Sequence, residues 1–149
     1  MTIVISNIKT TPVLVPFRRP PVTASGAIGE LPLVLLDVET DVGLTGHAYL
    51  FVFLKSMLKP TMSCVAAIEE LVRGMSADPE QVDPLLRQRL RLLDVHGILG
   101  QVLAGLDMAL WDIRAKSEDL SLAKVLGDPR EYVKTYNSCG LWLEKGDPE

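Results

Sequence analysis

Leu103-Ala-Gly-Leu-Asp-Met-Ala-Leu-Trp-Asp112 lies in the most strongly periodic part of the chain. Apolar residues recur there at spacings of three and four, which predicts an amphipathic helix from Gly97 to about Lys116. The small residues Ala104, Gly105 and Ala109 would let another element pack closely against this helix. The apolar face is formed by Leu99, Val102, Leu103, Leu106, Leu110 and Ile113.

Asp107 is unusual because apolar and small residues surround it in this helix. A buried carboxylate without a partner costs several kcal/mol, so Asp107 needs hydrogen-bond donors. Trp111 shares its face, whereas Asp112 lies about 140° away around the helix and cannot form a carboxylate pair with it. We expect Asp107 to tie the helix to neighbouring backbone rather than to act directly in chemistry.

Extended segments precede the helices. Pro12 and Pro16 lack amide donors, so the first strand should lie at a sheet edge or contain a bulge. Together the segments predict a three-stranded antiparallel meander. The expected order is a strand at 3–17, a loop at 18–29, a strand at 33–40, a turn at 41–43 and a strand at 43–51.

Helical spacing dominates after the third strand. Asp78-Pro79 supplies a helix cap followed by a first-turn proline, and Gly74 and Gly127 mark helix ends. Strands followed by helices predict an α+β domain, in which a helical bundle follows the meander. The expected helices span 63–72, 79–93, 97–116 and 121–126, and residues 132–143 read as extended again.

Composition predicts a folded protein, and the expected lack of targeting segments predicts a cytoplasmic one. The 149 residues suit one domain, and a 48% hydrophobic fraction with a mean hydropathy of +0.23 excludes intrinsic disorder. A net charge of −4 argues against nucleic-acid and anionic-membrane partners. We expect no signal peptide or membrane span, and Cys64 and Cys139 read as free thiols.

No motif of a common catalytic class occurs in the sequence. Phosphate-loop, His-Glu-x-x-His and Gly-x-Ser-x-Gly patterns are missing, and the acidic residues do not cluster as metal ligands. His47 reads as a core or hydrogen-bonded histidine, and His96 as a cap or loop residue at a helix entry. The residues themselves therefore identify no catalytic or metal-binding side chain.

Five stretches nevertheless form a recognisable series. They are Pro20-Pro-Val-Thr-Ala-Ser-Gly-Ala-Ile-Gly29, Pro32-Leu-Val-Leu-Leu-Asp-Val-Glu-Thr40, Gly43-Leu-Thr-Gly-His-Ala-Tyr-Leu-Phe51, the helical stretch at 103–112, and Tyr136-Asn-Ser-Cys-Gly140. In that order they resemble the mobile loop, second strand, third strand, last capping-domain helix and first barrel strand of the mandelate racemase and muconate-lactonizing family of the enolase superfamily. This resemblance implies a capping domain at 1–131 and the first strand of a truncated β/α barrel at 132–149.

The family resemblance implies abstraction of the α-proton of a small carboxylate substrate, a 2-hydroxy acid, with Mg2+ stabilising the enediolate. Acid-sugar dehydration and muconate cycloisomerisation are the alternatives within the superfamily. The family's magnesium ligands and its acid/base residues belong to the barrel, and none falls within 1–149. We therefore expect this chain alone to be inactive, and the resemblance implies a homo-oligomer for its parent.

The resemblance also implies five substrate-binding residues. Pro21, Val22, Ile28 and Phe53 match apolar positions around the substrate, and Ser138 matches a strand serine that approaches its carboxylate. The structural alternatives are that Val22 and Ile28 anchor the loop, that Phe53 belongs to the core, and that Ser138 satisfies backbone. Phe53 stands where mandelate racemase has a tyrosine, and Cys139 and Gly140 also depart from it, so the substrate could differ from mandelate.

Two readings of another class compete with an enzyme fragment: a self-standing binding or structural module, and a complete small enzyme of unknown type. The fragment reading leaves the segment 132–143 with unpaired edges and exposes Leu141, Trp142 and Leu143. It therefore predicts association through that segment, whereas a self-contained module would cover it.

Overall fold

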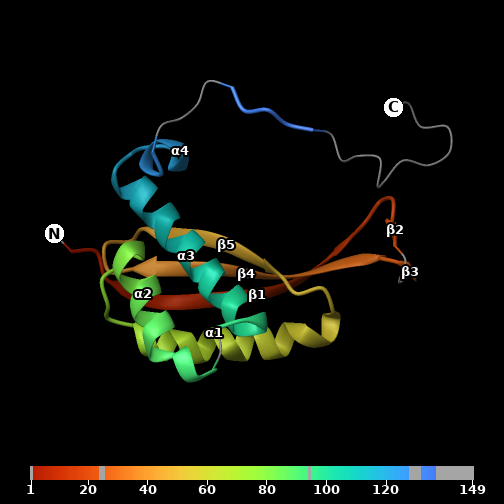
Figure 1. Cartoon of the computed structure of the whole chain (residues 1–149), viewed down its shortest axis with the longest axis horizontal. Coiled ribbons are helices and arrows are strands. Elements are labelled where there is room, and N and C mark those ends of the chain that lie inside the picture. The colour runs from red at the N-terminus through yellow and green to blue at the C-terminus, as the bar shows by residue number, and fades with distance from the viewer. Residues whose placement is uncertain (1, 24–25, 94, 128–131, 137–149) are drawn as a thin grey trace.

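Three long strands form the sheet. The computed structural model describes residues 2–23, 26–93, 95–127 and 132–136, and it places β1 (Ile5–Pro16), β4 (Glu30–Thr40) and β5 (Thr45–Phe51) in the order β1-β4-β5 (Figure 1). Both pairings are antiparallel, which confirms the expected meander. Strand β1 lies at the sheet edge, as its prolines predict, and its register shifts between Ile5 and Asn7, away from the prolines.

The segment expected to be a plain loop at 18–29 contains further structure. Strands β2 (Val22–Thr23) and β3 (Gly26–Ala27) pair antiparallel as a short ribbon. At its base the Phe17 N–H donates to the Gly29 carbonyl at 3.1 Å, next to the last β1–β4 pair, Pro16 and Glu30. The loop expectation is therefore wrong in part, because the chain continues the two-stranded pairing beyond the main sheet.

The helices follow the predicted order, with shifted bounds. They are η1 (Lys55–Met57), α1 (Leu58–Val72), α2 (Pro79–Arg89), η2 (Arg91–Leu93), α3 (Gly97–Ser117) and α4 (Leu122–Val125). Helix α1 begins five residues before the predicted start because Pro60 is tolerated in a first turn. Asp78 caps α2 as expected, accepting a hydrogen bond from the Glu80 N–H at 3.1 Å.

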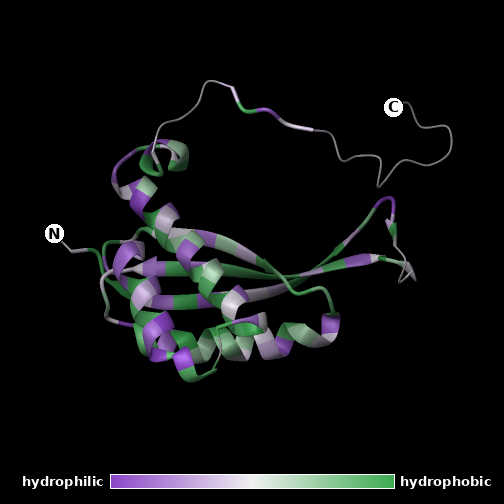
Figure 2. Cartoon of the chain, viewed as in Figure 1, coloured by the Kyte–Doolittle hydropathy of each residue, from purple (hydrophilic) through white to green (hydrophobic). Residues whose placement is uncertain are grey.

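One core lies between the sheet and the helices. Figure 1 shows α1 and α3 over the same face of the sheet, and Figure 2 shows hydrophobic and hydrophilic residues mixed along the strands. The inward residues Val34, Leu36 and Val38 of β4 are fully buried, as are Leu103 and Leu110 of α3. None of the helices in the described part of the chain is long and apolar enough to cross a bilayer.

Helix α3 packs on β5 at backbone distance. A Cβ atom added to Gly46 would lie 2.0 Å from the Ala109 carbonyl oxygen, and one added to Gly105 would lie 2.4 Å from Leu50 Cδ2. This confirms that Gly105 and Ala109 allow close packing, whereas Ala104 is exposed. The sheet and helix therefore meet without room for another methyl group.

Side chains of α3 also bond to the free edge of β5. The His47 N–H donates to Asp112 Oδ2 at 2.8 Å, and Lys116 Nζ donates to the Thr45 carbonyl at 2.7 Å. At the other end of the strand, Gln101 Nε2 donates to the Phe51 carbonyl. Groups on an edge strand have no neighbouring strand to bond, so these contacts satisfy them and cover the edge.

Asp112, not Asp107, is thus the aspartate that ties α3 to neighbouring backbone. It also forms an ion pair with Lys116 Nζ at 2.6 Å, one helical turn on. Burial pushes the Asp112 pKa upward, but the hydrogen bonds from Lys116 and the His47 N–H outweigh it and hold the pKa below its ordinary value. The charged form of Asp112 therefore stabilises the fold.

We predict that Gly46→Ala lowers the free energy of unfolding by about 1–3 kcal/mol, because the new methyl group must displace the backbone of α3. Urea denaturation followed by circular dichroism measures the change. Gly29→Ala is the matched control, since a Cβ at Gly29 meets no atom within 4 Å. Equal denaturation midpoints for the two variants would show that α3 and β5 do not touch as described.

We predict that Asp112→Ala costs about 1–2 kcal/mol at neutral pH, and that Asp112→Asn costs less because an amide oxygen still accepts from His47. A carboxyl pKa lowered by folding stabilises the protein above the unfolded pKa of about 4, and this stabilisation is lost as the pH falls through the folded pKa. Urea titrations at several pH values should show the wild-type advantage shrinking below about pH 4. A difference that is the same at pH 3 and pH 7 would contradict this assignment.

Candidate functional site

The ribbon holds three of the five expected substrate-binding residues together. Val22 pairs with Ala27 across β2 and β3, and the Ile28 N–H donates to the Pro21 carbonyl at 2.9 Å. Val22 is 79% exposed, so it does not anchor the ribbon to the rest of the described protein. The ribbon instead presents this apolar residue outward, while Ile28 is half-buried.

Phe53 lies just beyond the end of β5 and is held in an unusual backbone conformation. The Val52 N–H still donates to the Pro32 carbonyl at 3.2 Å, and Phe53 then turns with φ at 57°, in the left-handed region. Such a conformation is strained for a bulky residue and is enriched at functional sites. Phe53 is 70% exposed, and its ring lies against the ring of Phe51 at a tilt of 36°, with centroids 4.1 Å apart. The core alternative for Phe53 is therefore wrong.

The C-terminal end of β5, which Phe53 follows by two residues, and the ribbon lie at the same end of the sheet (Figure 1). A hollow of about 240 Å3 joins Phe53 to Gly29 and Glu30 at the base of the ribbon, and its other lining residues are Leu14, Pro32, Leu54 and Lys55. Strand pairing places them there, because Leu33 pairs with Phe51 near the β4 residues that meet the ribbon. The structure thus brings apolar groups from two distant segments to one surface.

Ser138 lies outside the described residues, and so do Cys139 and Gly140. Of the segment expected to be a barrel strand, residues 132–136 are described; they form no strand, and Tyr132 and Tyr136 are exposed. The assignment of 132–149 to the start of a barrel, with Ser138 on it, stays a prediction.

The groups that act on Asp107 are side chains, not the neighbouring backbone that was expected. Trp111, one turn further along α3, lowers the pKa of the Asp107 carboxyl group. Burial, followed by the charge of Asp83, raises the pKa of Asp107, and Trp111 and Arg87 oppose this only in part. Asp107 and Asp112 both line a hollow of about 590 Å3 whose wall is largely apolar, with Tyr49, Met108 and Leu126 exposed there.

Both histidines lie within the described residues, and neither belongs to a metal-binding cluster there. Of the two expected alternatives, His47 is a hydrogen-bonded histidine and not a core residue. Its Nδ1 lies 2.8 Å from Asp37 Oδ1 on the exposed face of the sheet. His96 occupies the N-cap position of α3 in an extended conformation, and its side chain makes no capping hydrogen bond to the helix. Within the described ranges, no three His, Cys, Asp or Glu side chains gather to hold a metal ion. The described residues therefore offer no binding site for a magnesium ion.

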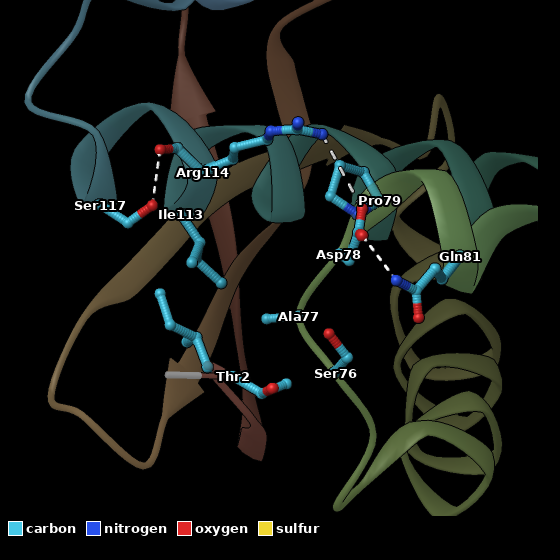
Figure 3. Close-up of a pocket in the computed structure, with 10 residues that line it drawn as sticks. Thr2, Ser76, Ala77, Asp78, Pro79, Gln81, Ile113, Arg114 and Ser117 are labelled. Carbon is cyan, nitrogen blue, oxygen red and sulfur yellow. Dashed lines mark hydrogen bonds and ion pairs between the residues drawn. The ribbon is translucent and has the colours of Figure 1, made fainter.

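A hollow of about 440 Å3 lies between the N-terminal residues and the C-terminal end of α3 (Figure 3). Among the described residues that line it, the cationic side chain is Arg114, which lies 2.8 Å from Glu80 Oε2, 3.3 Å from Glu118 Oε1 and 3.9 Å from Asp78 Oδ1. Three carboxylates thus balance this guanidinium, so the hollow provides no site for an anionic substrate.

The chain matches a known protein family over most of its length. The model of the mandelate racemase / muconate lactonizing enzyme N-terminal domain matches residues 5–127, from the start of β1 to just past α4. The L-talarate/galactarate dehydratase of Salmonella typhimurium is 35% identical over 118 residues, which cover 76% of this chain and 29% of that enzyme. The D-galactonate dehydratase of Xanthomonas campestris is 32% identical over 111 residues, covering 72% of this chain and 28% of the relative.

A solved structure agrees with these sequence matches. An enolase from Bradyrhizobium, complexed with magnesium and mandelic acid, superposes with a TM-score of 0.81 and 35% identity over 85% of this chain and 35% of that one. The chain spans less than a third of the length of the curated relatives. The fold, the order of its elements and the matched residues agree, and the chain belongs to the mandelate racemase / muconate lactonizing enzyme family through its N-terminal domain.

Proposed function

We propose that this chain supplies the capping domain of an enzyme that abstracts the α-proton of a 2-hydroxy acid with an apolar substituent. The observation that carries this proposal is the exposure of Phe53 in a strained conformation, at the sheet end that also bears Val22. Large apolar side chains that a regular sheet holds in solvent are typical of a surface that covers a ligand or a partner domain. The likeness to an enolase solved with mandelic acid supports the same substrate class.

In this proposal the ribbon and Phe53 form the apolar wall of the substrate pocket and exclude water. Excluding water strengthens the electrostatic interactions that stabilise an enediolate, as the reaction requires. The described residues offer no metal cluster, so we assign the magnesium ligands and the catalytic base to residues outside them. The cap would contribute specificity and shielding, with Pro21, Val22, Ile28 and Phe53 touching the substrate.

Acid-sugar dehydration is the second candidate, because two curated relatives at 35% and 32% identity are acid-sugar dehydratases. Polyhydroxylated acids carry many hydrogen-bonding groups, and each one buried without a partner costs free energy. Val22, Ile28 and Phe53 provide no polar side-chain atoms for such groups. The apolar wall therefore favours a 2-hydroxy acid with an apolar substituent over a polyhydroxylated acid sugar.

The remaining parts of the proposal concern the rest of the protein. We assign residues 132–149 to the beginning of a β/α barrel, with Ser138 approaching the substrate carboxylate, and we expect a homo-oligomer in the cytoplasm. A self-standing, non-catalytic module is the competing proposal, and activity measurements on the isolated chain and on a chimera separate the two.

We predict that the isolated 149-residue chain, given Mg2+ and (R)-mandelate or galactarate, shows no turnover, because its described residues provide no metal cluster. Chiral chromatography detects racemisation, and loss of galactarate detects dehydration. Measurable turnover of either substrate by the purified chain would contradict the proposal that the catalytic residues lie in a domain separate from this cap.

We predict that a chimera, with residues 1–127 replacing the matching segment of the Salmonella dehydratase, shifts the ratio of kcat/KM for mandelate over galactarate upward by about tenfold. Phe53→Ala in the chimera should reverse most of this shift, because it removes the apolar wall. Val42→Ala is the matched control, since Val42 is exposed in the turn at the opposite end of the sheet. The proposed wall would be refuted if the chimera had the same kcat/KM ratio as the Salmonella dehydratase. It would also be refuted if Val42→Ala changed this ratio as much as Phe53→Ala.

A further inference from the structure

The hollow of about 590 Å3 that Asp107 and Asp112 line is formed by β5, α3 and the residues around α4. Its volume lies within the range of small-molecule sites in proteins. Tyr49 is 62% exposed and Leu126 is 59% exposed, so the apolar wall of the hollow is open to a ligand. The lining is completed by His47, Ala48, Met108, Trp111, Lys116 and Leu122.

Asp107 brings a half-buried carboxylate to this wall, and the cations near it are already paired with other carboxylates. Arg87 Nε lies 2.8 Å from Asp83 Oδ2, and Lys116 Nζ lies 2.6 Å from Asp112 Oδ2. Burial raises the pKa of Asp107, and the negative charge of Asp83 raises it further. Because an opposite charge stabilises a half-buried carboxylate, a ligand cation beside Asp107 would bind favourably.

The other lining side chains suit a cation that carries an apolar body. Tyr49 presents an exposed aromatic ring, and cations are attracted to the faces of such rings. Met108 and Leu126 add exposed apolar surface next to it. Arg114 lies 5.3 Å from the centre of the Trp111 ring, but the three carboxylates described above balance its charge. The hollow therefore combines apolar and aromatic contact area with the carboxylate of Asp107.

We propose that this hollow binds a small organic ammonium ion with an aromatic or aliphatic body, whose charged end contacts Asp107 and whose body packs on Tyr49 and Met108. All of its lining residues belong to the described part of the chain, and Figure 1 shows α4 at the opposite end of the sheet from the ribbon. The proposal therefore stands apart from the proposed function. The ionisable side chains that line the hollow are His47, Tyr49, Asp107, Asp112 and Lys116.

Ligand-detected NMR on the full chain at neutral pH tests the proposal with benzylammonium and benzyl alcohol, which share a ring and differ in the charge of the end group. We expect benzylammonium to bind about three- to tenfold more tightly than benzyl alcohol. Asp107→Asn keeps the shape of the side chain and removes its charge, so it should abolish this preference while benzyl alcohol still binds. Glu70→Gln is the matched control, because it removes a negative charge from an exposed position outside the hollow, and it should leave the preference intact.

Two readouts on the wild-type chain need no variant. Benzylammonium should shift the Met108 methyl resonance, because this side chain lines the hollow, and added NaCl should weaken its binding more than that of benzyl alcohol. The proposal is overturned if neither probe binds, if both bind equally, or if the Met108 resonance does not move. It is also overturned if Asp107→Asn keeps the preference, or if Glu70→Gln loses it to the same extent, since the probe would then respond to the net charge of the chain.

Discussion

The close contact between Gly46 of β5 and Ala109 of α3 determines where the rest of this domain lies. No side chain separates the strand from the helix there, since a Cβ at Gly46 would overlap the Ala109 carbonyl. Two further contacts hold the same pair near its ends, from Lys116 to Thr45 and from Gln101 to Phe51. Helix α3 thereby replaces a fourth strand at the edge of β5 and fixes the direction in which that strand leaves the sheet.

The direction in which β5 leaves the sheet determines how Phe53 is presented at that end of the domain. Gln101 holds the Phe51 carbonyl two residues before Phe53, where the backbone enters the left-handed region. Residues in sparsely populated conformations persist when their surroundings over-determine them, and the bonds on both sides of β5 do so here. The exposed Phe53 and the hollow that joins it to the base of the ribbon both lie at this clamped strand end.

Sequence patterns predicted the elements well because periodicity depends on local geometry. The apolar stripe of 97–116 and the cap at Asp78 both identified helices that the structure contains. The pattern could not distinguish Asp107 from Asp112, because both flank the apolar stripe and only the docking of α3 decides which one meets the β5 edge. Phe53 came from a family resemblance alone, since a positive φ at a phenylalanine leaves no trace in composition or spacing. The burial of Thr61 likewise came only from the structure, because the expected helix began at residue 63.

Amide hydrogen exchange, followed residue by residue, tests this arrangement most directly. If α3 clamps β5, the amides of Leu50 and of Leu106–Leu110 should exchange together and among the slowest, through global unfolding. The amides of the exposed ribbon at Val22 and Ala27 should exchange orders of magnitude faster. Strand β5 exchanging as rapidly as the ribbon, while α3 stays protected, would contradict the view that one helix–strand contact sets the geometry of the functional end.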